Sequence, residues 1–223
     1  MNYLLSGDVG SGKTLKALKW MQNAALVQRR PVYTNIRLTP QCPFADRVAL
    51  LDDDEGNYPV LRGQPGSADY KAWWHYVLPG SMVVVDEGDL YFDCTDHSKL
   101  GEDVRQFHKM VRKVGIDVVY IVQSIQNMYV RIRRLTQRFV VCEFTYRTIG
   151  AFSWLPKSLS AFICAEYADE GLRMVKKSGR ISFGEASSMF SWYNTKQLLG
   201  DVGLYRNAHF STLLGKAVPD VIA

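Results

Sequence analysis

Eight residues near the N-terminus, Gly7–Thr14, constrain the fold of this chain more than any other stretch. They match the pattern G-x-x-x-x-G-K-S/T at every fixed position. The short apolar run Tyr3–Leu5 before them is typical of the end of a buried strand. After them, apolar residues recur at helical spacing, at Leu15, Leu18, Met21 and Ala25. A strand, a glycine-rich loop and a helix in this order predict a phosphate-binding loop.

Such a loop binds phosphate mainly through its backbone. Glycines allow successive N–H groups to turn inward, and the following helix adds its positive N-terminal end. In this interpretation the Lys13 amine reaches the β- and γ-phosphates of ATP, and the Thr14 hydroxyl is a ligand of Mg²⁺. The predicted nucleotide-binding residues are Gly7, Asp8, Val9, Gly10, Ser11, Gly12, Lys13 and Thr14.

A second motif begins with the unbroken apolar run Met82–Val85, which is typical of a strand buried on both faces of a parallel sheet. The run ends at Asp86 and Glu87. Beside a phosphate loop, we expect Asp86 to bind Mg²⁺ and Glu87 to act as the general base for a water molecule. Acids at this position favour ATP hydrolysis over a small-molecule kinase, because a kinase needs its base near an acceptor pocket.

Other polar residues leave alternatives open. Gln123 follows the apolar run Val118–Val122 and suits either a sensor of the γ-phosphate or the cap of a turn. Several arginines suit an arginine finger, which reaches the γ-phosphate of a neighbouring subunit, but equally suit DNA phosphates or a solvated surface. These are Arg131, Arg133 and Arg134, with Arg112 as a fourth.

The order of elements predicts an α/β protein of the P-loop NTPase class. Strands expected at 32–36 and 139–144, and a helix at about 100–114, indicate a mostly parallel sheet with helices on both faces. Prolines, glycines and acids in 39–72 predict an insertion of short helices and turns outside the core. Residues 160–180 predict a small C-terminal β-hairpin appendage.

Length and composition narrow the classes of protein. The 223 residues are enough for one large domain, and no run reaches the ~20 apolar residues that span a membrane. Because Met1 leads directly into the first strand, we expect no signal peptide and a cytoplasmic location. Four cysteines and four histidines lack metal-ligand spacing, so we expect reduced thiols and no structural zinc at Cys42, Cys94, Cys142 and Cys164.

Charge is concentrated in the middle of the chain. Residues 105–180 hold 14 Lys or Arg against 5 Asp or Glu, whereas residues 1–104 hold 10 against 14. The basic middle part suggests an anionic partner, such as nucleic acid or a membrane surface, or else a solvated basic face.

The motif-bearing segments, taken in order, resemble the zonula occludens toxin (Zot) family, which includes the gene I assembly proteins of filamentous phages. The resemblance covers roughly residues 1–196. It lies in Tyr3–Thr14, Val32–Ile36, Leu78–Ser81, Val85–Glu87, Val111–Asp117, Ile121–Gln123, Ile132–Leu135 and Trp192–Thr195.

This resemblance implies a P-loop ATPase of the additional-strand, catalytic-glutamate type, near the FtsK/HerA translocases. The ATPase domain would span 1–196, followed by a C-terminal tail, 197–223. By motif, Lys13 and Thr14 match the family's nucleotide site. Asp86 matches its magnesium site, and Glu87 matches its water site. Gln123 takes the sensor position.

The biological role implied by the resemblance is a motor that uses ATP and Mg²⁺ to translocate or extrude a viral genome. It implies a homo-oligomeric ring, hexameric by analogy, with Arg133 or Arg134 acting between subunits. The implied partners are viral DNA and phage assembly or capsid proteins. The implied location is the cytoplasm of the infected bacterial host, its inner membrane or the virion.

The sequence departs from the filamentous-phage pattern in one respect. Those proteins continue into a transmembrane helix, whereas this chain would reach a membrane only through a missing segment or a partner. Either it is a truncated cytoplasmic domain, or it is a soluble relative that suits a packaging ATPase of an icosahedral, membrane-containing phage. A metabolite kinase and a nucleotide-binding host-interaction scaffold without hydrolysis remain as alternative functions.

Overall fold

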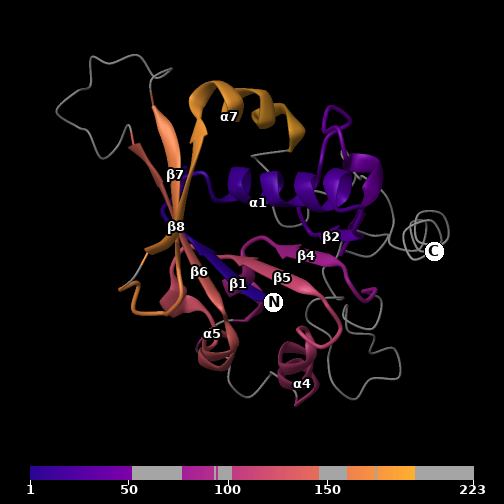
Figure 1. Ribbon diagram of the computed structural model, residues 1–223, viewed down its shortest axis with the longest axis vertical. Coiled ribbons are helices and arrows are strands. Elements are labelled where there is room, and N and C mark those ends of the chain that lie inside the picture. The colour runs from indigo at the N-terminus through magenta and orange to yellow at the C-terminus, as the bar shows by residue number, and fades with distance from the viewer. Residues whose placement is uncertain (52–76, 93, 95–101, 146–159, 174, 194–223) are drawn as a thin grey trace.

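An eight-stranded sheet forms the centre of the computed structural model, which describes residues 1–51, 77–92, 94, 102–145, 160–173 and 175–193 (Figure 1). Its strands, in chain order, are β1 (Asn2–Ser6), β2 (Val32–Thr34), β3 (Val48–Leu50), β4 (Met82–Val85), β5 (Asp117–Ile121), β6 (Arg138–Phe144), β7 (Ala161–Tyr167) and β8 (Val175–Ser182). Across the sheet they lie in the order β3-β2-β4-β5-β1-β6-β7-β8.

The first six strands in this chain order are parallel to one another. The P-loop strand β1 is central, with Leu5 opposite Ile121 of β5 on one side and Val140 of β6 on the other. All four residues of β4 are buried, as expected for a strand covered on both faces. The carboxyl ends of β1, β5 and β4 therefore meet at one edge of the sheet.

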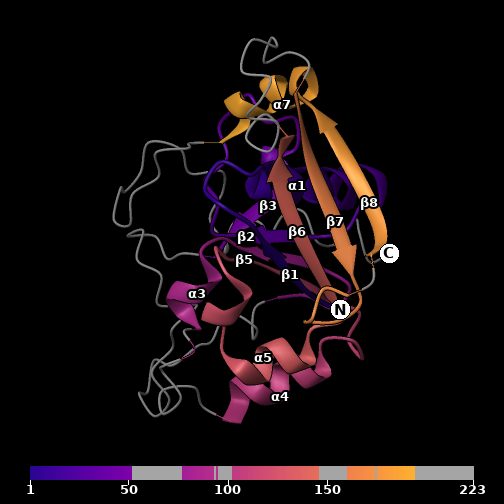
Figure 2. The same ribbon diagram turned by 90° about the vertical axis from the view of Figure 1, so that its left-hand side faces the viewer.

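Helices cover both faces of the sheet, as the sequence predicts (Figure 2). Helices α1 (Lys13–Gln22) and α7 (Phe183–Met189) lie on one face, and α4 (Glu102–Met110) and α5 (Val130–Leu135) on the other. The shorter elements are the helix α3 (Gly88–Tyr91), the π-helical turn η1 (Asn23–Val27) that continues α1, and the 3₁₀ turns η2 (Ala45–Arg47), η4 (Ile125–Asn127) and η7 (Phe190–Trp192).

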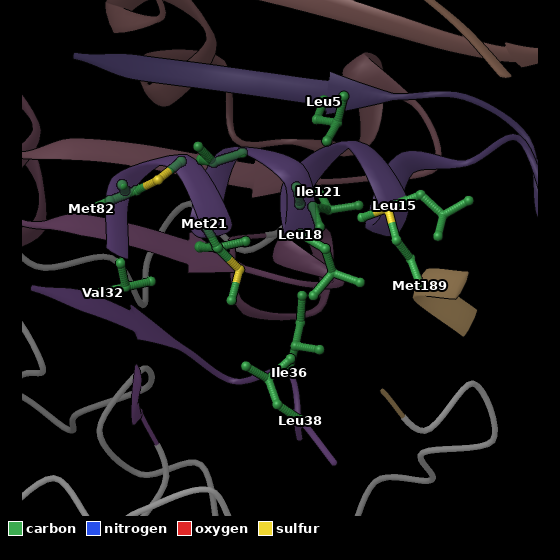
Figure 3. Close-up of a cluster of buried hydrophobic side chains, with 14 of the residues drawn as sticks. Leu5, Leu15, Leu18, Met21, Val32, Ile36, Leu38, Met82, Ile121 and Met189 are labelled. Atoms are coloured by element: carbon green, nitrogen blue, oxygen red, sulfur yellow. The ribbon is translucent and has the colours of Figure 1, made fainter. Parts of the chain in front are cut away.

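The core between α1 and the sheet contains the predicted apolar stripe. Leu15, Leu18 and Met21 are almost completely buried, and Ala25 continues the stripe in η1. They pack with side chains of several strands and with Met189 of α7 (Figure 3). Since burial of each such side chain contributes about 1.5–3 kcal/mol, this cluster fixes α1, and with it the loop that precedes α1.

The second core lies between the sheet and helices α4 and α5. Val111 and Ile132 are buried there against β5 and β6. Helix α4 is shorter than the predicted helix at 100–114, because it ends at Met110 and the chain turns before Gly115, which has a positive φ of 72°. Val114, assigned by the sequence pattern to the buried stripe, is 38% exposed for this reason.

The predicted hairpin at 160–180 forms, and it extends the main sheet. β7 pairs antiparallel with β6: Phe139 lies opposite Tyr167 at one end of the pairing, and Phe144 lies opposite Phe162 at the other. β8 in turn pairs antiparallel with β7. The two strands thus continue the main sheet beyond β6.

Among the elements that were not predicted are a strand and a helix of the core. Within the proposed insertion 39–72, β3 is a buried strand that pairs in parallel with β2; three apolar residues among prolines gave too short a signal. Helix α7 was also missed, although its cap was readable: the Ser182 hydroxyl accepts a hydrogen bond from the Glu185 N–H at 3.2 Å. Residues 52–72 of the insertion and the tail 197–223 lie outside the described residues.

The amino edge of the sheet is tied together by Arg30. Its guanidinium donates to the carbonyls of Gly80 and Ser81 at 2.5 and 2.9 Å and to the Asp117 carboxylate at 2.6 Å. The N-terminal amine of Met1 also bonds Asp117, at 2.9 Å. These contacts join the starts of β1, β4 and β5, which sets the register of the three strands that end at the site.

All four cysteines are free, and Cys142 and Cys164 share a hydrogen bond across β6 and β7 at 2.6 Å. In the parts of the chain that the structure describes, no helix has both the length and the apolarity to cross a membrane.

Candidate nucleotide site

The loop Gly7–Thr14 has the strand–loop–helix context that its sequence predicts. β1 ends at Ser6, and α1 starts at Lys13 with Gly12 as its N-cap in the left-handed region, at φ 92°. The Ser11 N–H donates to the Asp8 carbonyl at 3.1 Å, which closes the loop on itself. The first turn of α1 has N–H groups without a partner inside the helix, and these are available to an anion bound by the loop.

Close packing explains why glycines occupy two of the loop positions. A Cβ atom on Gly7 would collide with the backbone carbonyl of Cys142 in β6. A Cβ atom on Gly12 would lie 2.5 Å from the Phe162 ring of β7. The loop therefore rests directly on β6 and β7, and a larger residue at either position would push it off this support.

The Lys13 amine folds back over the loop. Its Nζ donates to the carbonyls of Gly7 at 2.6 Å and Asp8 at 3.0 Å. Burial lowers the pKa of Lys13, and the negative charge of Asp86 acts in the opposite direction. An anion entering the loop would offer this amine a stronger, charge-assisted partner than two neutral carbonyls.

The acid pair lies at the same edge of the sheet as the loop. Asp86 directly follows β4, and one of its carboxylate oxygens accepts a hydrogen bond from the Glu87 N–H at 3.0 Å. Burial raises the pKa of Asp86 to about 6, and the charge of Glu87 adds to the increase while that of Lys13 reduces it. Because β1 and β4 both pair in parallel with β5, the loop after β1 and the acids after β4 lie at one edge, and the charges of Lys13 and Asp86 each affect the pKa of the other.

Glu87 occupies a constrained turn. Its φ of 52° is unusual for a residue with a side chain, and its own side chain is exposed. Gly88 follows as the first residue of α3, and a Cβ atom there would come within 3.1 Å of the Tyr120 ring of β5. The turn thus packs tightly on β5 while the Glu87 carboxylate remains accessible to solvent and to a ligand.

The residues present fit a magnesium nucleotide. The Ser11 hydroxyl is buried and has no hydrogen-bond partner among the described residues, so the loop contains an unsatisfied polar group of the kind that a phosphate would bond. Thr14 and Asp86 offer hard oxygen ligands, which Mg²⁺ prefers. The arrangement can bind a triphosphate and bring a carboxylate base to it.

The remaining predicted residues lie in different places. Gln123 is exposed two residues after β5, at the same edge as the loop and the acid pair. Arg131 and Arg134 on α5 and Arg112 are also exposed. Arg133 is committed to an ion pair, with Nη1 2.8 Å from the Glu170 carboxylate in the turn between β7 and β8.

Helix α5 ends near the amino edge of the sheet. The Asn2 side chain at the start of β1 donates to the Leu135 carbonyl at 3.2 Å, and the Gln137 N–H donates to the Asn2 carbonyl at 3.0 Å. The phosphate loop begins at the other end of β1, about 13 Å away at the usual strand rise. The arginines near the end of α5 therefore lie far from their own loop.

Sequence reasoning missed several residues that shape the site. Phe162 and Cys142 support the loop from the hairpin side, and Asn35 and Tyr193 lie next to Asp86. The signal for Asn35 was its position at the end of the strand beside β4. Tyr193 lies in the segment Trp192–Thr195 that resembles the Zot family, but nothing in the sequence connected it to Asp86. No motif marked Phe162 and Cys142, because their contacts come from strand pairings that are distant in sequence.

The comparisons with known proteins agree with this geometry. The chain matches the protein family described as Zonular occludens toxin (Zot) over residues 1–158. No curated protein matches the chain. Among solved structures, the N-terminal domain of zonular occludens toxin from Neisseria meningitidis is 18% identical, with a TM-score of 0.56 over 86% of this chain and 98% of that one. B204, the DNA-packaging ATPase from Sulfolobus turreted icosahedral virus, is 12% identical, with a TM-score of 0.50 over 78% and 95% of the two chains.

Proposed function

Because the chain belongs to the zonular occludens toxin (Zot) family, we propose that it is an ATP-hydrolysing motor of phage assembly, which translocates or extrudes the viral genome. The observation that carries this proposal is the meeting of two motifs at one sheet edge. The loop that follows β1 and the acids that follow β4 lie at the same edge because both strands are parallel to β5, and Glu87 follows Asp86 with its carboxylate exposed.

In the proposed reaction each group has a role that its position supports. The N–H groups of the loop and the Lys13 amine bind the phosphates of ATP and stabilise the negative charge that develops on them. Thr14 and Asp86 would hold Mg²⁺, which when bound would neutralise negative charge on the phosphates. Glu87 accepts the proton of the attacking water, and Gln123, which is exposed at the same edge of the sheet, contacts the γ-phosphate or that water.

A soluble genome-packaging ATPase of an icosahedral, membrane-containing phage is the second candidate. The likeness to B204 supports it, since the two chains share a fold over most of their lengths. Both candidates entail a homo-oligomeric ring, a hexamer by analogy, that acts on viral DNA with capsid or assembly proteins. Both place the protein in the infected host, in the cytoplasm, at the inner membrane or in the virion.

Phosphate release from ATP, with and without DNA, tests this proposal. The parent protein should hydrolyse ATP in the presence of Mg²⁺. Lys13→Ala should lose nucleotide binding and turnover, whereas Glu87→Gln should keep binding and lose turnover by roughly 10²- to 10⁴-fold, the usual effect of removing a general base. Glu143→Gln, the same change at an exposed glutamate of β6, is the matched control and should leave turnover unchanged.

Two outcomes would contradict the proposal. Hydrolysis by Glu87→Gln at the parent rate would remove Glu87 as the base. Nucleotide binding without phosphate release, in every oligomeric form and with DNA present, would favour the scaffold function instead. Transfer of phosphate to a small acceptor would favour the kinase.

A further inference from the structure

The side chain of Asn35 takes the place of a missing strand residue beside Asp86. β2 ends at Thr34, whose partner on β4 is Val84. Beyond this pair, the Asn35 side chain bonds both backbone groups of Asp86. Its Oδ1 accepts from the Asp86 N–H at 2.7 Å, and its Nδ2 donates to the Asp86 carbonyl at 3.0 Å.

These two hydrogen bonds fix the backbone on both sides of the Asp86 Cα. One holds the peptide group before Asp86 and the other holds the peptide group after it. The Asp86 carboxylate is in turn bonded to the Glu87 N–H. Because Asn35 is only 7% exposed, water has little access to replace the amide in this arrangement.

The segment that follows Asn35 is itself held by the C-terminal end of the described chain. Leu38 forms an antiparallel bridge with Tyr193, and the Thr39 N–H donates to the Trp192 carbonyl at 2.8 Å. The Thr39 hydroxyl donates to the Ser191 carbonyl. Burial, and next the charge of Asp86, raises the pKa of Tyr193 to about 12, so this phenol also lies in the field of Asp86.

We propose that Asn35 is a positioning residue of the nucleotide site, which holds the backbone of Asp86 and so aims the Asp86 and Glu87 carboxylates at the phosphate loop. The bridge between residues 38–39 and 191–193 keeps Asn35 in place. The effect on magnesium rests on the proposed function, because it requires Asp86 to serve Mg²⁺. The two hydrogen bonds from the Asn35 side chain to the Asp86 backbone, which we call the clamp, do not depend on the proposed function.

Two measurements on Asn35→Ala test the proposal. Hydrogen exchange of the Asp86 amide should become at least 10-fold faster, because the Asn35 Oδ1 atom that accepts its hydrogen bond is removed, while the amides of Val83 and Val84 should keep the parent rates. The Mg²⁺ concentration for half-maximal binding of a non-hydrolysable ATP analogue should rise by roughly 10- to 100-fold, as for other residues that orient metal ligands. Binding of the analogue in EDTA should be unchanged.

Controls separate this role from general destabilisation. Asn23→Ala makes the same change at an exposed position of η1 and should alter neither measurement. If Asn35→Ala does not fold, Asn35→Ser retains a polar side chain that is too short to reach both backbone groups, and it should show the same two effects.

The outcomes also separate this proposal from the proposed function. An unchanged exchange rate at Asp86 in the folded variant would overturn the clamp. Faster exchange with an unchanged Mg²⁺ requirement, in a parent protein that hydrolyses ATP, would overturn the positioning role while the motor function stands. If exchange is faster in Asn35→Ala but the parent protein neither binds Mg²⁺–ATP nor hydrolyses it, the clamp is supported and the proposed function is wrong.

Discussion

At the scale of single residues, the site holds a carboxylate in an unfavourable environment. Asp86 is paired with no cation at hydrogen-bond distance among the described residues, and burial raises its pKa to about 6 from an ordinary value of 3.8. Ionisation of Asp86 therefore destabilises the folded protein, and a cation bound to the carboxylate would offset this destabilisation. Functional sites commonly carry such local instability.

This leads to a prediction about stability in the absence of metal. Asp86→Asn should raise the free energy of unfolding in EDTA at pH 7 by up to about 3 kcal/mol, since each unit of pKa shift corresponds to about 1.4 kcal/mol. The sign follows from the raised pKa: below pH 3.8 both folded and unfolded states are protonated and the cost is absent. The cost develops between pH 3.8 and about pH 6 and is complete above that range.

Denaturant unfolding at several pH values measures this effect. The stability difference between Asp86→Asn and the parent should be small at pH 4 and largest near pH 7. The exposed Asp46→Asn supplies the control and should show no such pH-dependent gain. A difference that stays constant across this range would mean that burial of Asp86 does not penalise its charge.

At the scale of elements, the hairpin β7–β8 is part of the nucleotide site. Phe162 of β7 is 4% exposed, stacks on Phe144 with ring centroids 4.6 Å apart, and lies against Gly12. The antiparallel extension of the sheet thus forms the wall behind the N-cap of α1. A substitution in β7 that alters the packing against Gly12 should therefore shift the backbone N–H groups that bind phosphate.

Phe162→Leu is therefore expected to affect binding as well as stability. It should lower the free energy of unfolding by about 1–2 kcal/mol, in the usual range for a buried substitution, and it should weaken ATP binding because Gly12 loses its support. Calorimetric titration with an ATP analogue measures the second effect. Ile163→Ala, at the neighbouring position that is 40% exposed on the opposite face, should leave ATP binding unchanged. Equal affinities for Phe162→Leu and the parent would make β7 a purely structural strand.

The elements also show what the sequence could and could not predict. The continuous apolar residues of β4 and β5 were sufficient to predict two buried strands, and the glycine pattern before Lys13 was sufficient to predict the loop, because each signal is local. The joining of β7 to β6 was not readable, since it depends on pairings such as Cys142 with Cys164 across 22 positions. The position of Asn35 near the end of a strand was visible in the sequence, but its role at the site was not, because that role depends on β2 and β4 being neighbours.

At the scale of the whole molecule, the position of α5 bears on how subunits would cooperate. Arg134 is exposed near the end of α5, toward the amino edge of the sheet, whereas the phosphate loop lies at the carboxyl edge. Arg133 is held by Glu170. An arginine finger from this helix would therefore act on a neighbouring subunit, which requires a ring with head-to-tail contacts.

Mixing of two inactive variants tests this arrangement. Arg134→Ala should lower turnover by at least about 10³-fold if it removes a finger, and Lys13→Ala should lack turnover because its own loop cannot bind ATP. In a mixed ring, an intact loop of the Arg134→Ala subunit can meet an intact Arg134 from a Lys13→Ala neighbour. About a quarter of the contacts in an equal random mixture have this arrangement, so turnover should return to a measurable fraction of the parent rate.

The pairing of variants decides between the possible arginines. Arg131→Ala serves as the matched control, because Arg131 is exposed on the same helix, and by itself it should hydrolyse ATP at the parent rate. An inactive Arg134→Ala protein whose turnover returns on mixing with Lys13→Ala would assign the finger to Arg134, because only a residue that acts across a subunit contact can be supplied by a different chain. Two results would show that Arg134 of α5 is not the finger: hydrolysis by Arg134→Ala at the parent rate, or a mixture with Lys13→Ala that stays inactive although the two proteins co-assemble. The exposed arginines of α5 would then contact DNA phosphates or solvent.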